Sequence, residues 1–146
     1  MSSKKSCIVE FDGAAKGNPG PAGAGAVLRS EDGRVICRLS EGVGNATNNV
    51  AEYRGMLLGV KHAMSEGYER ISVQGDSQLV TNQVEGHWRT RSENLQPLCS
   101  EVQGLRNNFD SFEARHVPRD YNRDANDLAN MGVHLKDGEV RVYKDY

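Results

Sequence analysis

Three β-type segments open the chain, and this run constrains the fold more than any other feature of the sequence. Residues 7–12 are rich in β-branched and aromatic side chains and end in a glycine-rich turn. Residues 24–29 and 34–40 have the same character, and Asp32-Gly33 between them is typical of a hairpin turn. The first part of the chain is therefore predicted to be an antiparallel meander.

Helical and strand patterns alternate after this meander. A polar stretch leads into a helix over about residues 50–66, which carries an apolar stripe at helical spacing. The later elements, in chain order, are a strand over 70–75, a short helix after Ser77, a helix over 94–107, a strand over 111–117 and a helix over about 123–131. The order βββαβααβα predicts an α/β fold with a mixed five-stranded sheet, an antiparallel meander plus parallel strands, flanked by helices.

Length and composition narrow the class of protein. The 146 residues suffice for a single domain over 1–146, and residues 131–146 form a polar tail with no assigned element. Lys and Arg number 18 against 20 Asp and Glu, a net charge of -2, which excludes a polybasic binder but not a local basic face. No apolar run approaches the ~20 residues of a membrane span. We expect a monomer without membrane contact.

The three cysteines indicate the redox environment. Cys7, Cys37 and Cys99 are odd in number and far apart, and they fit neither a disulfide framework nor a zinc spacing. Free buried thiols predict a reducing intracellular compartment: cytoplasm, nucleus or organelle. The start of the chain shows neither a signal core nor an arginine-rich leader.

Three carboxylates are candidates for a metal site. Asp12 and Asp76 each end a predicted strand, and Glu52 lies near the start of the first helix. If the two strands are neighbours, the three groups converge at one edge of the sheet and repel one another unless divalent cations lie between them. Oxygen ligands suit Mg²⁺ or Mn²⁺. Two such ions, ~3.5–4 Å apart, would activate a water and stabilise the leaving oxygen of a phosphodiester.

Each of these carboxylates also has an ordinary structural explanation. Asp12 would equally be an acidic turn residue in a glycine-rich loop, and Asp76 would equally begin a helix. Asn49 as N-cap with Glu52 three residues later is close to a capping box. Residue types and spacing alone leave these alternatives open.

Other chemistries have less support in the sequence. The histidines are scattered without a metal-ligand pair, and no Gly-x-Ser-x-Gly elbow occurs. Trp88 lies between His87 and Arg89 in a polar connection. A tryptophan beside cations suits a base or sugar contact, and it equally suits a packing lid over the core.

Four ordered motifs carry a family resemblance. They are Phe11-Asp12-Gly13 with Gly17-Asn18-Pro19-Gly20, Thr47-Asn48-Asn49-Val50-Ala51-Glu52, Gly75-Asp76-Ser77-Gln78, and Arg115-His116-Val117-Pro118-Arg119 leading to Asn122 and Leu128-Ala129-Asn130. With these motifs the chain, over about residues 7–130, resembles type 1 ribonuclease H of the compact bacterial, archaeal and plant-like variety. The resemblance implies a ribonuclease H-like fold. It also implies a metal-dependent endoribonuclease that cuts the RNA strand of RNA–DNA hybrids, using two Mg²⁺ ions held by four acids, with Mn²⁺ as a substitute.

The resemblance also implies roles for individual residues. Asp12 would bridge both ions, Glu52 and Asp76 would hold the ion on the leaving-group side, and Asn126 occupies the place of the fourth acid. The implied nucleic-acid contacts are Gly13, Asn18, Asn48 and Gln78 toward RNA, Thr47 and Asn82 toward DNA phosphates, and Asn49, Ser77, Trp88 and Arg89 in the same interface.

Asn126 departs from the family pattern Asn-x-x-Ala-Asp-x-Leu-Ala. The flanking Ala125 and Leu128 set the register, so Asp127 comes one residue late, which is ~100° of helix rotation. An amide keeps the size of an acid but loses its charge. We hypothesise that the chain binds hybrid and metal but cleaves weakly or not at all. The alternatives are a non-catalytic hybrid-binding module and another nuclease of this fold, a resolvase or a 3′–5′ exonuclease.

The sequence offers few basic side chains for binding a nucleic-acid substrate. The connection over residues 86–93 is short, with only Arg89 and Arg91, where some family members carry a basic helical insertion. In the tail, Lys136, Arg141 and Lys144 either add contacts or simply end the chain. We expect modest hybrid affinity that falls steeply with salt.

Overall fold

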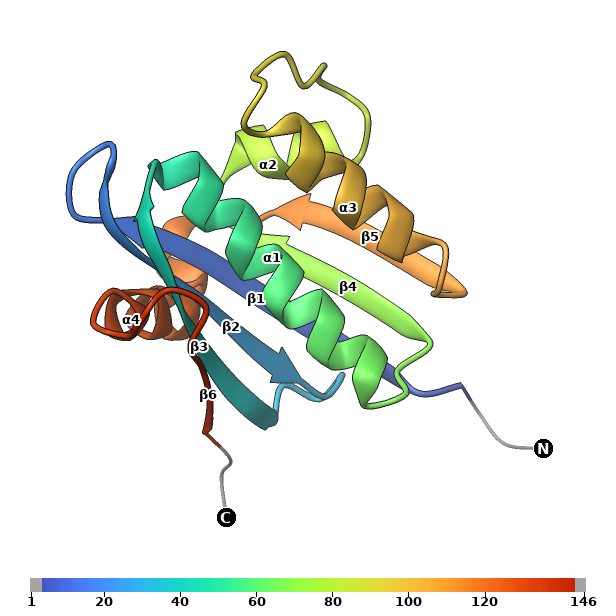
Figure 1. The fold of residues 1–146 in the computed structure, drawn as a ribbon. Coiled ribbons are helices and arrows are strands. Elements are labelled where there is room, and N and C mark those ends of the chain that lie inside the picture. Colours follow the sequence, from blue (N-terminus) through green and yellow to red (C-terminus); the bar gives the residue numbers. More distant parts are fainter. Residues whose placement is uncertain (1–3, 144–146) are drawn as a thin grey trace.

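The computed structural model describes residues 4–143; residues 1–3 and 144–146, with Lys144 among them, lie outside the described part. Within it, one mixed sheet has the strand order β5-β4-β1-β2-β3-β6 (Figure 1). The strands are β1 (Ser6–Ala15), β2 (Gly20–Arg29), β3 (Val35–Ala46), β4 (Arg70–Gly75), β5 (Ser111–His116) and β6 (Val140–Tyr143). The meander β1-β2-β3 is antiparallel, as predicted, while β4 runs parallel to β1 and to β5.

The prediction of five strands was wrong, because the polar tail contributes a sixth. Strand β6 pairs antiparallel with β3, from Arg38 opposite Tyr143 to Glu41 opposite Val140. Its four residues are too few for a recognisable alternating pattern, and three of them are exposed. The strand is stabilised by hydrogen bonding to the otherwise unpaired edge of β3, and the residues of the tail alone do not indicate this pairing.

Helices cover both faces of the sheet. The helices are α1 (Asn48–Ser65), α2 (Gln78–Val84), α3 (Gln96–Arg106) and α4 (Arg123–Gly132), and a 3-10 turn, Arg119–Tyr121, precedes α4. Figure 1 shows α1 and α3 in front of the sheet and α4 behind it. All four predicted helices are present, with ends shifted by a few residues. Within residues 4–143, no helix is long and apolar enough to cross a membrane.

Buried apolar side chains of the described residues form three clusters, and two of them lie on either side of the site. Val9 and Phe11 are fully buried in the large core beneath α1, α2 and α3. A smaller core under α4 joins Val27 to Ala125 and Leu128. The end of β1 therefore lies between helices on the two faces of the sheet, and side chains from both can reach it.

Helix α1 begins earlier than the capping-box interpretation supposed. Its N-cap is Thr47, whose Oγ1 accepts a hydrogen bond from the Val50 backbone N–H at 3.3 Å. Asn49 is already inside the helix, and Glu52 lies five residues after the cap rather than three. The capping-box alternative for Glu52 is thus wrong, and its carboxyl group is free for another role.

Gly25 lets α4 lie directly on β2. A Cβ atom at this position would be 2.4 Å from the Ala129 backbone N and 2.5 Å from the Ala125 backbone O. No side chain fits such a gap, so the helix backbone contacts the strand backbone. This close approach brings α4 near the end of β1.

We predict that Gly25→Ala lowers the free energy of unfolding by about 1–3 kcal/mol, because the new methyl group displaces α4. Urea denaturation followed by circular dichroism measures the loss. Gly104→Ala in α3 is the control, since a Cβ there meets nothing within 4 Å. It should stabilise the protein by about 0.5–1 kcal/mol through helix propensity. Equal effects of the two variants would contradict the close-approach argument.

Candidate functional site

Three carboxylates meet at the edge of the sheet. Asp12 comes from β1, Glu52 from α1 and Asp76 from the residue after β4, and one oxygen of each lies within 4.8 Å of the others. Asp12 and Glu52 are 4% and 6% exposed, while Asp76 is partly buried. They line a pocket of about 370 Å³, together with Gly13, Asn48, Ser77, Arg119 and Asn126. The convergence expected from the strand order is therefore present.

Gly13 brings α1 close enough for Glu52 to join this cluster. A Cβ atom at Gly13 would lie 2.2 Å from the Glu52 backbone N and 2.2 Å from the Ala51 carbonyl carbon. The start of α1 thus rests on the backbone of β1. The Gly13 backbone N–H also donates to Asp12 Oδ1 at 2.9 Å, which orients the central carboxylate.

Burial makes the cluster electrostatically unfavourable by itself. Burial, followed by the charge of Asp12, raises the pKa of Glu52 to about 10. Burial also raises the pKa of Asp12, against the opposing effect of a hydrogen bond from Asn126. Glu52 Oε2 is buried without a hydrogen-bond partner. Oxygen ligands, crowded negative charge and an unpartnered oxygen fit a divalent cation.

Asn126, on α4, directs its amide nitrogen toward Asp12. Its Nδ2 donates to Asp12 Oδ2 at 2.8 Å. Asn130 Nδ2 donates to Asn126 Oδ1 at 3.3 Å, and Lys16 Nζ donates to Asn130 Oδ1 at 2.6 Å. This chain of bonds orients the amide, so Asn126 acts here as a hydrogen-bond donor to Asp12.

The two neighbouring aspartates do not reach the cluster. Asp127 is exposed to solvent, one residue around the helix from Asn126. Asp124 forms an ion pair with Arg29. The structure therefore places the amide of Asn126, and neither of these carboxylates, against Asp12.

Asn122 and Arg119 belong to the site, although their motif by itself indicates no role for either. Asn122 is 1% exposed, and its Nδ2 donates to Asp76 Oδ1 at 3.0 Å and to the Phe11 carbonyl at 2.9 Å. It thereby ties Asp76 to β1. Arg119 lines the acidic pocket and brings a positive charge to it. Both residues lie in the last of the four motifs, and this position is the sequence feature that could have identified them.

The candidate nucleic-acid contacts fall into separate groups. Gly13, Asn48 and Ser77 line the acidic pocket. Asn18, Thr47, Asn49 and Arg89 line a second pocket of about 400 Å³. Trp88 is 47% exposed and lines a third. Gln78 is exposed and Asn82 partly exposed, and neither lines any of these three pockets.

Comparisons with known proteins agree with this architecture. A family model described as reverse transcriptase-like matches residues 10–132. Ribonuclease HI of Halobacterium salinarum is 42% identical over 123 residues, which cover 84% of this chain and 62% of that protein. A ribonuclease H of Anaplasma marginale is 32% identical, over 89% of this chain and 92% of that protein.

Solved structures extend the comparison to the fold. The crystal structure of RNase H1 from Halobacterium salinarum has a TM-score of 0.85 at 39% identity, covering 88% of this chain and 97% of that one. LC11-RNase H1, solved in complex with an RNA/DNA hybrid, has a TM-score of 0.83 at 29% identity, covering 87% and 96%. The chain spans 62% of the length of the Halobacterium relative and 34% of three mycobacterial relatives.

We predict that a divalent cation, tested as Mg²⁺, binds with the release of about one proton near neutral pH, because Glu52 with a pKa of about 10 is protonated there and must ionise to act as a ligand. The apparent Mg²⁺ affinity should therefore rise with pH up to that pKa. Titration calorimetry in buffers of different ionisation enthalpy measures the released protons.

Glu52→Gln is the informative variant for this experiment. It should abolish the proton release and raise the melting temperature in EDTA, since it removes a buried ionisable group. Glu93→Gln, at an exposed position, is the matched control and should change neither. Proton release that persists in Glu52→Gln would contradict the assignment.

Proposed function

We propose that this chain, which belongs to the ribonuclease H family, cleaves the RNA strand of RNA–DNA hybrids endonucleolytically, with reduced activity because of Asn126. The single observation that carries the proposal is the cluster of Asp12, Glu52 and Asp76, whose ligand atoms lie within 4.8 Å of one another in a pocket at the sheet edge. A related protein, LC11-RNase H1, has been solved with an RNA/DNA hybrid. The family and the pocket together support this substrate class.

The acidic cluster would hold divalent cations, and we propose two Mg²⁺ ions, with Mn²⁺ as a substitute. The oxygen ligands would come from Asp12, Glu52 and Asp76. Among the described residues, Glu52 Oε2 has no hydrogen-bond partner, so it is available to bind a cation. When bound, the cations supply the charge that favours attack by a water and departure of the leaving oxygen.

The residues around the cluster would position the nucleic acid. Arg119 places a fixed positive charge in the acidic pocket, where it would attract a phosphate. Asn48 and Ser77 line the same pocket and offer hydrogen-bonding groups. The remaining proposed contacts are Gly13, Asn18, Thr47, Asn49, Gln78, Asn82, Trp88 and Arg89. We propose that the chain works as a monomer, with one such surface per molecule.

Asn126 would lower the rate of cleavage. Its amide nitrogen donates to Asp12, and its oxygen accepts from Asn130. The amide oxygen would have to turn away from Asn130 to act as a ligand, and it would bring no negative charge. The same observation favours a second candidate function, a module that binds hybrid without cutting it.

We predict that Asn126→Asp raises Mg²⁺-dependent cleavage of an RNA–DNA hybrid by about tenfold or more, since ~1.4 kcal/mol of added transition-state stabilisation is tenfold in rate. Single-turnover assays on a labelled hybrid measure the change. Asp127→Ala is the matched control and should leave the rate of the parent chain unaltered. Loss of cleavage in Asp127→Ala would identify Asp127 as the working fourth acid and overturn this assignment.

We predict a preference for hybrid over both homoduplexes in a panel of RNA–DNA hybrid, double-stranded RNA and double-stranded DNA, assayed with the Asn126→Asp variant. Cleavage of either homoduplex in preference to hybrid would contradict the proposal. If the variant binds hybrid but produces no cleavage with Mg²⁺ or Mn²⁺, the binding module is the correct function.

A further inference from the structure

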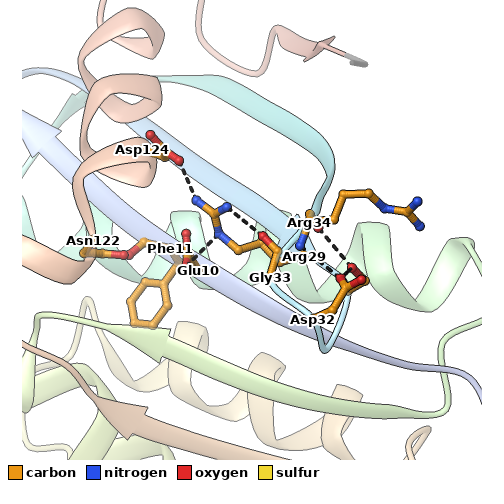
Figure 2. A network of polar contacts seen from close by, with 9 residues as sticks. Glu10, Phe11, Arg29, Asp32, Gly33, Arg34, Asn122 and Asp124 are labelled. Atoms are coloured by element: carbon orange, nitrogen blue, oxygen red, sulfur yellow. Dashed lines mark hydrogen bonds and ion pairs between the residues drawn. The ribbon is translucent and has the colours of Figure 1, made fainter. Parts of the chain in front are cut away.

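An ion-pair network lies behind the acidic cluster, at the opposite side of α4 from Asn126. Arg29, at the end of β2, makes contacts to three separate segments (Figure 2). Its Nε donates to Glu10 Oε2 at 3.0 Å, its Nη1 to the Gly33 carbonyl at 3.2 Å, and its Nη2 to Asp124 Oδ2. One guanidinium thus joins β1, the β2–β3 turn and the first turn of α4.

The network is largely removed from solvent. The side chains of Glu10 and Arg29 are 11% and 21% exposed, and that of Asp124 is 43% exposed. A carboxylate as buried as Glu10 is costly unless it is paired, and the two acids share one cation. Replacement of Glu10 and Arg29 by apolar residues would fill the same space without this cost, so the polar arrangement calls for a reason beyond stability.

Helical geometry suggests that reason. Asp124 and Asn126 are two residues apart, which is about 200° around the helix axis. The buried residues of α4, among them Ala125, Leu128 and Ala129, lie between these two directions and face the sheet. The ion pair of Asp124 and the hydrogen bond of Asn126 therefore flank the buried stripe on opposite sides.

The interface beneath α4 contains few large side chains. The helix rests on β2 at Gly25, where the backbones meet, and two of its buried residues are alanines. Interlocking side chains normally set the rotation of a helix on its support, and this interface has few of them. Ser40 Oγ donates to the Leu128 carbonyl at 2.7 Å within the buried stripe, and the polar contacts on the two flanks add to this central bond in setting the rotation.

We propose that Glu10, Arg29 and Asp124 form a positioning clamp that sets the roll of α4 and so directs the side chain of residue 126 at Asp12. The predicted effect on cleavage rests on the proposed function. The predicted effect on the orientation of the Asn126 side chain does not, because it concerns the parent chain without substrate. The clamp also explains why Asp124 cannot serve as the missing fourth acid, since its carboxylate is engaged by Arg29.

The geometric claim is tested on the full chain by NMR, without any cleavage assay. The side-chain amide signals of Asn126 are identified by their disappearance in Asn126→Asp. In Arg29→Met and in Asp124→Ala, these signals should shift toward those of exposed asparagines, and their protons should exchange with water about tenfold faster. Asp124→Asn keeps an acceptor oxygen for Arg29 and should restore the parent signals.

Two matched controls accompany these variants. Arg34→Met removes a guanidinium from the same hairpin, and Figure 2 shows that side chain extending away from the network. Asp127→Ala removes an exposed carboxylate from the same helix. Neither should move the Asn126 signals. Unchanged Asn126 signals in both Arg29→Met and Asp124→Ala would overturn the proposal, and so would equal changes in the controls. If Arg29→Met fails to fold, the signals of Asp124→Ala decide the question, because Asp124 is partly exposed and its replacement is tolerated more easily.

The catalytic consequence is measured in the Asn126→Asp background. Adding Asp124→Ala there should lower kcat about tenfold with KM changed by less than about twofold, because a displaced ligand impairs reaction rather than hybrid binding. A rise in KM at unchanged kcat would contradict positioning. If Asn126→Asp itself does not cleave, the proposed function fails while the NMR result still decides the clamp.

Discussion

Backbone-to-backbone contact at two glycines underlies the whole arrangement around Asp12. Gly13 lets the start of α1 rest on β1, and Gly25 lets α4 rest on β2, from opposite faces of the sheet. A single Cβ at either position would overlap backbone atoms at 2.2–2.5 Å. Because both helices lie this close, Glu52 and Asn126 reach the same carboxylate. The site is thus a consequence of how closely the layers pack.

Close packing of this kind leaves the orientation of side chains to polar contacts. Asn122 ties Asp76 to β1, Asn130 orients the amide of Asn126, and Arg29 holds Asp124 on the far flank of α4. Each contact except that of Asn130 links segments distant in the chain. The acidic groups at the centre are buried and repel one another when all are ionised, so contacts outside the cluster have to impose their geometry. These outer contacts connect the fold to the proposed chemistry.

Local sequence patterns predict much of the fold. The strand patterns, the glycine turns and the helical stripes indicate the mixed sheet and its helices, since neighbouring residues determine these elements. The expected end of the first strand at Asp12 was wrong, because β1 continues to Ala15 through its pairing with β2. Two further expectations, the number of strands and the N-cap of α1, were wrong because contacts between distant segments decide them. Strand β6 exists through pairing with the edge of β3, and the cap of α1 is Thr47 rather than Asn49 because the helix begins earlier. Asn122 and Arg119 received no role, since a motif does not state which atoms a side chain contacts.

The amino-acid sequence by itself determined the identity and order of the groups: three acids, an asparagine in the last motif, and glycines beside them. Through the register of Ala125 and Leu128, it also leads to our proposal that residue 126 stands in the fourth acid's place. Only the tertiary structure decided that the Asn126 amide presents its nitrogen to Asp12, that Asp124 is engaged by Arg29, and that Glu52 is buried with a raised pKa. The physical reason is that hydrogen bonding, ion pairing and burial depend on neighbours brought together from distant parts of the chain, and no local pattern specifies them.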